Sequence, residues 1–292
     1  GLACTILIYL WVSDELRVYK FHEKDSQLYQ LMEHRLLEGE IGLSTWTSGL
    51  TAPTLAEEYP EVEYAVACFN LDAYTLSVDN NDIQATGQYV GEDFFKMFSF
   101  PLLQGDASQV LTDRNSIVIS ETLAMNLFNT TENVVGKTIE WQHEEQYQIS
   151  GVFEDVPRNA STQFDFVLPF KIYMEDEGWA TRWRTSWPLT YALLKPGTDV
   201  DQLNEKIADL IERKTNGEVT HRVLFAAPYS NTYLYGNYEN GKQSGGRIEY
   251  VRLFSVIAVF ILLIACINFM NLSTAKASRR LKEVGIKKAV GA

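Results

Sequence analysis

The sequence has few of the residues from which catalytic and metal sites are usually built. Only four of its 292 residues are histidine, and no two of them have the i,i+4 spacing or the HExxH pattern of a zinc helix. The chain also has no GxSxG nucleophile turn and no GxxxxGK(S/T) phosphate loop. These absences argue against a zinc enzyme and against ATP hydrolysis by this chain itself. The histidines are expected at the surface or in turns, at His22, His34, His143 and His221.

Cysteine is equally scarce, with three in the chain. Cys4 and Cys266 fall in apolar segments near the two ends, so Cys68 stands alone between them. One thiol cannot form a disulfide within a domain. The region between the apolar segments must therefore be held by an ordinary hydrophobic core.

Basic residues are rare outside the C-terminal tail. Residues 1–275 contain 19 Lys and Arg against 37 Asp and Glu, a net charge of −18. Nucleic acids and anionic surfaces both bind clustered positive charge. The acidic body therefore argues against nucleic acid as a partner.

One long apolar run is present, at Val251–Leu272. Its last 20 residues include only three polar side chains and would form about 30 Å of helix, the thickness of a bilayer core. Residues 276–292 then carry six Lys and Arg and one Glu. Because short basic flanks stay in the cytoplasm, we predict a transmembrane helix over 251–273, with the C-terminus inside and everything before Val251 outside.

The N-terminal apolar stretch is shorter. Residues 1–12 would cover about 18 Å of helix, which is too little to cross a membrane. A signal peptide and a short core helix are both open, but no basic residue precedes the stretch. The preferred interpretation is the C-terminal part of a first transmembrane helix.

The region between, residues 13–250, shows two strand–helix–strand patterns. The first predicts strands at 28–36 and 62–69 around a helix at 50–59. The second predicts strands at 189–195 and 220–226 around a helix at 200–215, which Asp199 caps and Asn216-Gly217 ends. Two βαβ units thus bracket the middle of the chain.

The middle section, residues 72–170, is predicted to be rich in short strands. They are expected at 74–78, 83–90, 116–119, 138–141 and 147–153, with helices at 92–97 and 121–128. The fold class is accordingly α+β, with an extracytoplasmic domain of paired βαβ units and an inserted strand-rich lobe, flanked by transmembrane α-helices.

Two further patterns leave alternatives open. Trp179, Trp183 and Trp187 are spaced by four, which suits either a core-packed segment or an aromatic ligand platform. We favour the core. The pattern of residues 274–292 predicts an amphipathic helix able to lie along the inner membrane face. This helix could be a passive anchor or a lever that touches a cytosolic partner.

The segment ILLIACINFMNLSTAKASRRLKEVGIKKAVGA resembles the second membrane helix and cytoplasmic continuation of MacB/FtsX-type ABC transporter permeases, especially those of Bacteroidetes-like bacteria. GLACTILIYLWVSDELRVYKFHEKDSQLYQL is similar to the end of their first membrane helix. ATGQYVGEDFFKMFSFPLLQGDAS and YQISGVFEDVPRNASTQFDFVLPF resemble blocks of the MacB-like periplasmic core.

The resemblance implies a multi-pass permease of the bacterial inner membrane with a large periplasmic domain. Its porter-like part would be residues 13–71 and 171–250, and its inserted lobe 72–170. Such permeases are thought to work by mechanotransmission, in which ATP hydrolysis on a partner ABC ATPase moves the outer domains. This chain would then hold no cofactor of its own. The resemblance places the ATPase-coupling residues at Glu283, Gly285, Lys287, Gly291 and Ala292.

The resemblance also implies other partners: a second permease in a homodimer or heterodimer, a periplasmic membrane-fusion protein and the lipid bilayer. An alternative from another class is a two-helix membrane receptor with an extracytoplasmic sensing domain. A third hypothesis is a membrane-anchored envelope enzyme. The sequence argues against it, because it contains no recognisable catalytic constellation.

Overall fold

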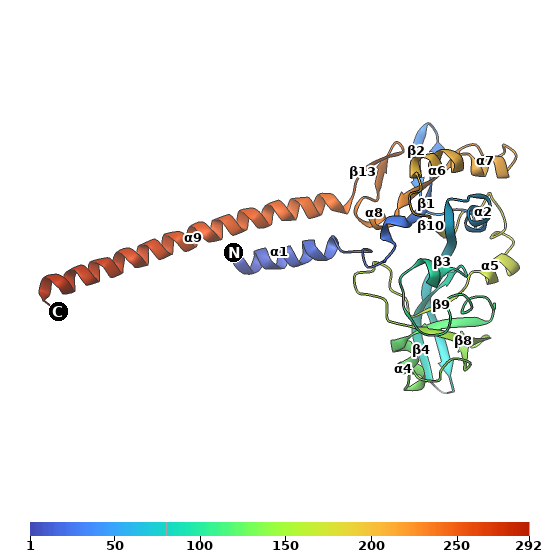
Figure 1. Cartoon of the computed structure of the whole chain (residues 1–292), viewed down its shortest axis with the longest axis horizontal. Coiled ribbons are helices and arrows are strands. Elements are labelled where there is room, and N and C mark those ends of the chain that lie inside the picture. Colours follow the sequence, from blue (N-terminus) through green and yellow to red (C-terminus); the bar gives the residue numbers. More distant parts are fainter. Residues whose placement is uncertain (80, 292) are drawn as a thin grey trace. The chain divides into compact units, whose positions relative to one another are not determined.

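The computed structural model describes residues 1–79 and 81–291 and divides them into two compact units (Figure 1). The helical unit consists of Gly1–Arg17 and the segment from Gly246 onward. The sheet unit is Val18–Gly245. All three clusters of buried apolar side chains are drawn from the sheet unit, so that unit carries its own hydrophobic core.

The sheet unit contains one large mixed sheet. Its strands follow the order β11-β1-β10-β3-β4-β9-β6-β8-β5, with β2 paired to β1 and β7 paired to β3 and β8. The strands are β1 (Leu28–Leu37), β2 (Glu40–Ser44), β3 (Val62–Val78), β4 (Asn81–Val90), β5 (Leu102–Gln104), β6 (Ser116–Ser120), β7 (Thr138–Trp141), β8 (Glu145–Phe153), β9 (Phe166–Pro169), β10 (Leu189–Leu194) and β11 (Arg222–Pro228). A separate hairpin joins β12 (Asn237–Glu239) to β13 (Lys242–Gly245).

The helices of the sheet unit are short. They are α2 (Thr51–Glu58), α3 (Phe94–Met97), α4 (Glu121–Phe128), α5 (Lys171–Asp176), α6 (Val200–Ile207), α7 (Leu210–Lys214) and α8 (Tyr229–Leu234). In Figure 1, α2, α6 and α7 lie at the end of the sheet unit that holds β1 and β10, and α4 lies at the end that holds β4 and β8.

The two predicted βαβ units interlock. β10 pairs antiparallel with both β1 and β3, and β1 pairs antiparallel with both β10 and β11. Each unit therefore has parallel outer strands with a strand of the other unit between them, the split βαβ arrangement. Leu55 of α2, Ile207 of α6 and Leu210 of α7 are buried in one cluster against these strands.

Strand β3 corrects the prediction of two separate strands at 62–69 and 74–78. It is one strand of 17 residues, and its pairing with β4 shifts register between Phe69 and Asp72. Asn70 takes a left-handed conformation there, with φ 55°. The sequence pattern suggested that the strand ends at 69 and a new one begins at 74. The structure instead has a β-bulge at this place, and the strand continues through it.

The predicted helix at 200–215 is divided into α6 and α7. The carbonyl of Ala208, between them, accepts a hydrogen bond from Leu224 N of β11 at 3.3 Å. The predicted signals at both ends are confirmed. Asp199 accepts bonds from the backbone N–H groups of Asp201 and Gln202, and Asn216 and Gly217 have positive φ.

The helical unit consists of α1 (Leu2–Glu15) and α9 (Arg247–Val290). They run antiparallel, because a Cβ on Gly1 would lie 2.8 Å from Ala265 Cβ while Trp11 meets Phe254 edge to face at 5.1 Å. Within the described residues, α9 alone is long and apolar enough to cross a membrane. That residues 1–12 end a first transmembrane helix stays a prediction.

A buried ion pair joins β1 to β11. Arg222 donates from Nε to Glu33 Oε2 at 2.7 Å and from Nη2 to Glu33 Oε1 at 2.5 Å, and Glu33 is fully buried. Arg222 Nη1 also donates to the carbonyl of Trp183 at 3.0 Å, and Nη2 donates to Ser186 Oγ. One guanidinium therefore fixes the edge of the sheet to the irregular segment before β10.

Replacing Arg222 by Met should destabilise the fold strongly, because it leaves the Glu33 carboxylate buried without its main partner. We expect a loss of about 3–5 kcal/mol in the free energy of unfolding, measured by urea titration of the purified chain. The double variant Glu33→Leu/Arg222→Met should lose less, since no charge is left uncompensated. The matched control is Arg184→Met, whose ion pair with Glu218 is exposed. An Arg222→Met effect no larger than this control would contradict the role assigned to the buried pair.

Candidate functional site

Of the five residues predicted to engage an ATPase, the four that the structure describes lie at the end of α9. Glu283 and Lys287 are exposed there, and Gly285 has no atom within 4 Å of where a Cβ would stand. Gly291 ends the helix in the left-handed conformation, with φ 80°, and its N–H bonds to the Lys287 carbonyl. Ala292 lies outside the described residues. The described positions 283, 285 and 287 are thus exposed, and the coupling role of the segment stays a prediction.

The helix that carries these residues is continuous. The amphipathic segment was expected as a helix able to lie along the membrane face, yet α9 passes from the apolar run into the basic segment with no break. No proline occurs in it, and Gly285 is its one glycine. Its 44 residues correspond to about 66 Å of helix.

The expectation for the histidines is wrong at His22. His22 is 4% exposed. Its imidazole lies among the rings of Phe21, Phe98 and Phe100, with ring centroids 4.0, 5.2 and 5.5 Å from its own. Nδ1 accepts a bond from Ser99 N at 3.1 Å, and burial lowers the pKa of His22 to about 4.

The other three histidines differ in exposure. His34 is half-buried and stacks on Phe225 at 4.1 Å, and burial lowers its pKa. His143 and His221 are exposed, as predicted, and His143 lies in a turn. Within the described ranges, no group of three or more His, Cys, Asp or Glu side chains is arranged to hold a metal ion.

The three tryptophans do not form a stripe. Residues 177–188 contain turns and no helix, so spacing by four does not align them. Trp179 packs against Phe69 at 5.1 Å, and Trp183 packs against the cluster beneath α2 and α6. These two agree with the favoured core packing. Trp187 does not, because it is 50% exposed at the rim of a cavity.

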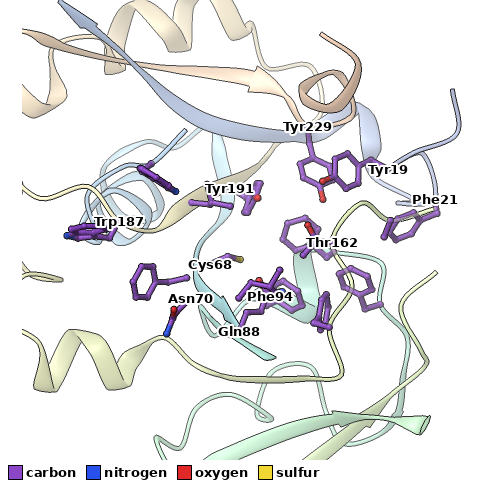
Figure 2. Close-up of a pocket in the computed structure, with 18 residues that line it drawn as sticks. Tyr19, Phe21, Cys68, Asn70, Gln88, Phe94, Thr162, Trp187, Tyr191 and Tyr229 are labelled. Carbon is purple, nitrogen blue, oxygen red and sulfur yellow. The ribbon is translucent and has the colours of Figure 1, made fainter. Parts of the chain in front are cut away.

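That cavity, of about 290 Å³, lies over three neighbouring strands, β10, β3 and β4. Cys68 stands opposite Leu189 on β10 and opposite Val90 on β4. Tyr191 and Gln88 are each two residues from these partners. Because side chains two residues apart on a strand share a face, Cys68, Gln88 and Tyr191 lie on the same face of the sheet. Figure 2 shows the rings of Tyr19 and Tyr229 at one end and Trp187 at the other, with Cys68 and Gln88 between them.

The polar groups in the cavity are held uncharged. Burial raises the pKa of the Cys68 thiol and raises the pKa of Tyr191 well above its usual range. A deprotonated thiolate or phenolate is therefore disfavoured, and neither group is suited to nucleophilic or base chemistry. The cavity is therefore suited to binding a ligand, and Cys68 and Tyr191 do not form a nucleophile and base pair within it.

Sequence reasoning missed this cavity. Its lining comes from separate segments around residues 19–21, 46, 68–71, 88–100, 160–164, 187–191 and 229. The one local signal was the aromatic density of FFKMFSF, residues 94–100, which supplies three of the rings. Only the sheet order brings the remaining segments together.

His22 should make the stability of the fold depend on pH. The folded state holds a neutral imidazole with pKa near 4, against 6.5 for the ordinary value. The unfolded chain therefore binds more protons below pH 6.5, so this stabilisation is complete above pH 6.5 and is lost as the pH falls to 4. Its size is roughly 3 kcal/mol.

Urea titrations of the chain at pH 7 and pH 4 check this expectation. His22→Asn, which keeps an acceptor near Ser99 N, should lack this component of the pH dependence, whereas the matched control His221→Asn should retain it. Equal pH dependence in His22→Asn and the unaltered protein would refute it.

Comparison with known proteins assigns the family. The model of the MacB-like periplasmic core domain matches residues 1–210. The macrolide export ATP-binding/permease protein MacB of Salmonella choleraesuis is 23% identical over 224 residues, which cover 74% of this chain and 32% of that protein. The chain therefore spans about a third of the length of its curated relatives.

Solved structures agree on the fold. A domain assigned to a permease protein of Porphyromonas gingivalis superposes with a TM-score of 0.61 at 26% identity, covering 71% of this chain and 93% of that one. The periplasmic region of MacB from Actinobacillus actinomycetemcomitans gives a TM-score of 0.50 at 14% identity, covering 70% and 89%. With more than half of its residues matched by the family model, the chain belongs to the MacB-like periplasmic core domain family of ABC transporter permeases.

Proposed function

We propose that this chain is the permease subunit of a MacB-like ABC transporter and that it couples ATP hydrolysis on a partner ATPase to movement of its periplasmic domain. The family match supports the periplasmic permease domain. Permeases of this family work with an ABC ATPase. The coupling step, by export or by mechanotransmission, is our proposal.

The observation that carries the proposal is the continuity of α9. Its apolar part, Val251–Leu272, is long enough to cross the bilayer core. A further 18 residues, Ser273–Val290, add about 27 Å of helix beyond it. A helix without a kink transmits displacement along its length, because deforming it would break backbone hydrogen bonds. The basic end of α9, after Leu272, would therefore move together with its first residues, which follow the sheet unit at Gly245.

The end of α9 suits a protein contact. Glu283 and Lys287 are exposed and lie one helical turn apart, and Glu283 has no ion pair among the described residues. Gly285 between them lets another backbone approach closely. We assign Glu283, Gly285, Lys287 and Gly291, together with Ala292, to the ATPase contact.

The remaining assignments follow the same proposal. ATP binds to the partner ATPase, and this chain holds no cofactor. The permease pairs with a second permease, spans the bacterial inner membrane more than once and meets a periplasmic membrane-fusion protein. Residues 13–71 and 171–250 form the porter-like part, and 72–170 form the lobe. The strand order supports this division, because β11, β1 and β10 lie on one side of β3 and β4, β9, β6, β8 and β5 lie on the other, while β3 itself crosses the boundary between residues 71 and 72.

Topology is the first test. The basic residues after Leu272 place the C-terminus in the cytoplasm and the sheet unit in the periplasm. Alkaline phosphatase, which is active only outside the cytoplasm, should therefore be active when fused near residue 150 and inactive when fused after residue 292. The reverse activities would refute the orientation and with it the proposed function.

Coupling is the second test. Glu283→Lys in the full-length protein with its ATPase should abolish stimulation of ATP hydrolysis, since reversing a charge at a contact weakens it by roughly tenfold or more. The matched control is Glu212→Lys, an equally exposed reversal on α7. ATPase stimulation that survives Glu283→Lys would exclude a coupling role for this residue.

A further inference from the structure

We propose that the cavity over β10, β3 and β4 binds an uncharged, flat aromatic small molecule that forms a hydrogen bond with Gln88. This inference stands apart from the coupling role of α9. It rests on the lining, the size and the unpartnered polar groups of the cavity, and on the bulge beside it.

The lining selects against charge. Of the 18 described residues that line the cavity, 11 are aromatic and none is Asp, Glu, Lys, Arg or His. An anion would lose its hydration and gain no ion pair, and a cation would have only the attraction of the ring faces in place of a counter-charge. Aromatic rings instead favour stacked or edge-to-face contact with another ring, and such pairs contribute beyond the area they bury. Leu71, Leu189 and Ala160 are the aliphatic minority, which makes an alkyl chain a poorer fit.

The size selects a small ligand. An apolar cavity of about 150 Å³ holds benzene. This cavity, at about 290 Å³, is close to twice that volume and lies at the lower limit of ordinary small-molecule sites. A two-ring molecule therefore fits. Trp46 and Trp187 are both about half exposed at its rim, so a ligand can reach it from solvent.

Gln88 supplies a specific polar contact. Its side chain is 92% buried, and its amide has no hydrogen-bond partner among the described residues. Neither amide atom of Gln88 is among the fully buried polar atoms without a partner in the described chain, so the amide is open to the cavity and can meet a ligand there. The hydroxyls of Thr162 and Tyr191 also line the cavity and have no hydrogen bond within the described part of the chain. A ligand hydroxyl or carbonyl would satisfy Gln88.

The β-bulge explains why Gln88 is free. Phe69 stands opposite Tyr89 and Asp72 opposite Gly87, so Asn70 and Leu71 together face Gln88 alone. Both bulged residues line the cavity, where the local twist separates β3 from β4 side chains. Bulges of this kind occur often beside binding sites. The bulge thus leaves the Gln88 side chain in the lining of the cavity, where Figure 2 labels it.

The test is equilibrium dialysis of 2-naphthol against the 292-residue chain in lipid nanodiscs, with empty nanodiscs subtracted. Saturable binding of one molecule per chain is expected. Gln88→Leu should weaken it roughly three- to tenfold, the loss of one hydrogen bond. The matched control Gln84→Leu, an exposed position on the same strand, should leave it unchanged. Thr162→Trp should abolish binding by filling the cavity.

Charge is tested with ligands of similar size. Naphthalene-2-sulfonate should bind at least about tenfold more weakly than 2-naphthol, because its charge finds no counter-charge in the cavity. Trimethylphenylammonium should also bind more weakly, since the ring faces replace only part of its lost hydration. The proposal is overturned if 2-naphthol shows no saturable binding, if Gln88→Leu binds it as tightly as Gln84→Leu, or if either charged probe binds as well. These comparisons decide the matter even if Thr162→Trp does not fold.

Discussion

The structure depends on one long strand. β3 pairs along its first half with β10 and along its second half with β4 and β7, so a single backbone runs from the interlocked βαβ units into the remainder of the sheet. The two halves are offset by the bulge between Phe69 and Asp72. A tilt of one half against the other would have to deform these few residues and the continuous strand β4, which pairs with β3 on both sides of the bulge. The cavity lies against that same point.

Buried polar contacts also stabilise the large sheet and the segments packed on it. The Glu33–Arg222 pair anchors the segment before β10 to the β1–β11 edge, and the hydroxyls of Thr47 and Thr190 bond at 2.7 Å beneath it. Ser120 caps α4 by accepting a bond from Leu123 N. Each contact satisfies a group that would otherwise be buried without a partner. The order of the sheet is therefore fixed by pairing as well as by apolar burial.

Much of this fold could be predicted from local patterns. The strands at 28–36 and 138–141 and the helices at 50–59 and 121–128 were predicted from local patterns, and elements of the same type occur there. The short strands β5 and β9 were not predicted, because they are defined by pairing with strands elsewhere in the chain, β5 with β8 and β9 with β4 and β6. The Glu33–Arg222 pair joins residues 189 positions apart, and no spacing rule connects them. His22 and the cavity were missed for the same reason, because their surroundings come from segments far apart in the sequence.

The central claim is that α9 transmits movement between its basic end and the periplasmic domain. It is tested most directly by the distance between spin labels at Glu144→Cys, an exposed turn position, in two permease subunits of the full-length complex. We predict that ATP with vanadate changes this distance in the Ser273→Ala protein and leaves it unchanged in Ser273→Pro, where proline interrupts the helix after the membrane. An equal change in both proteins would contradict the account.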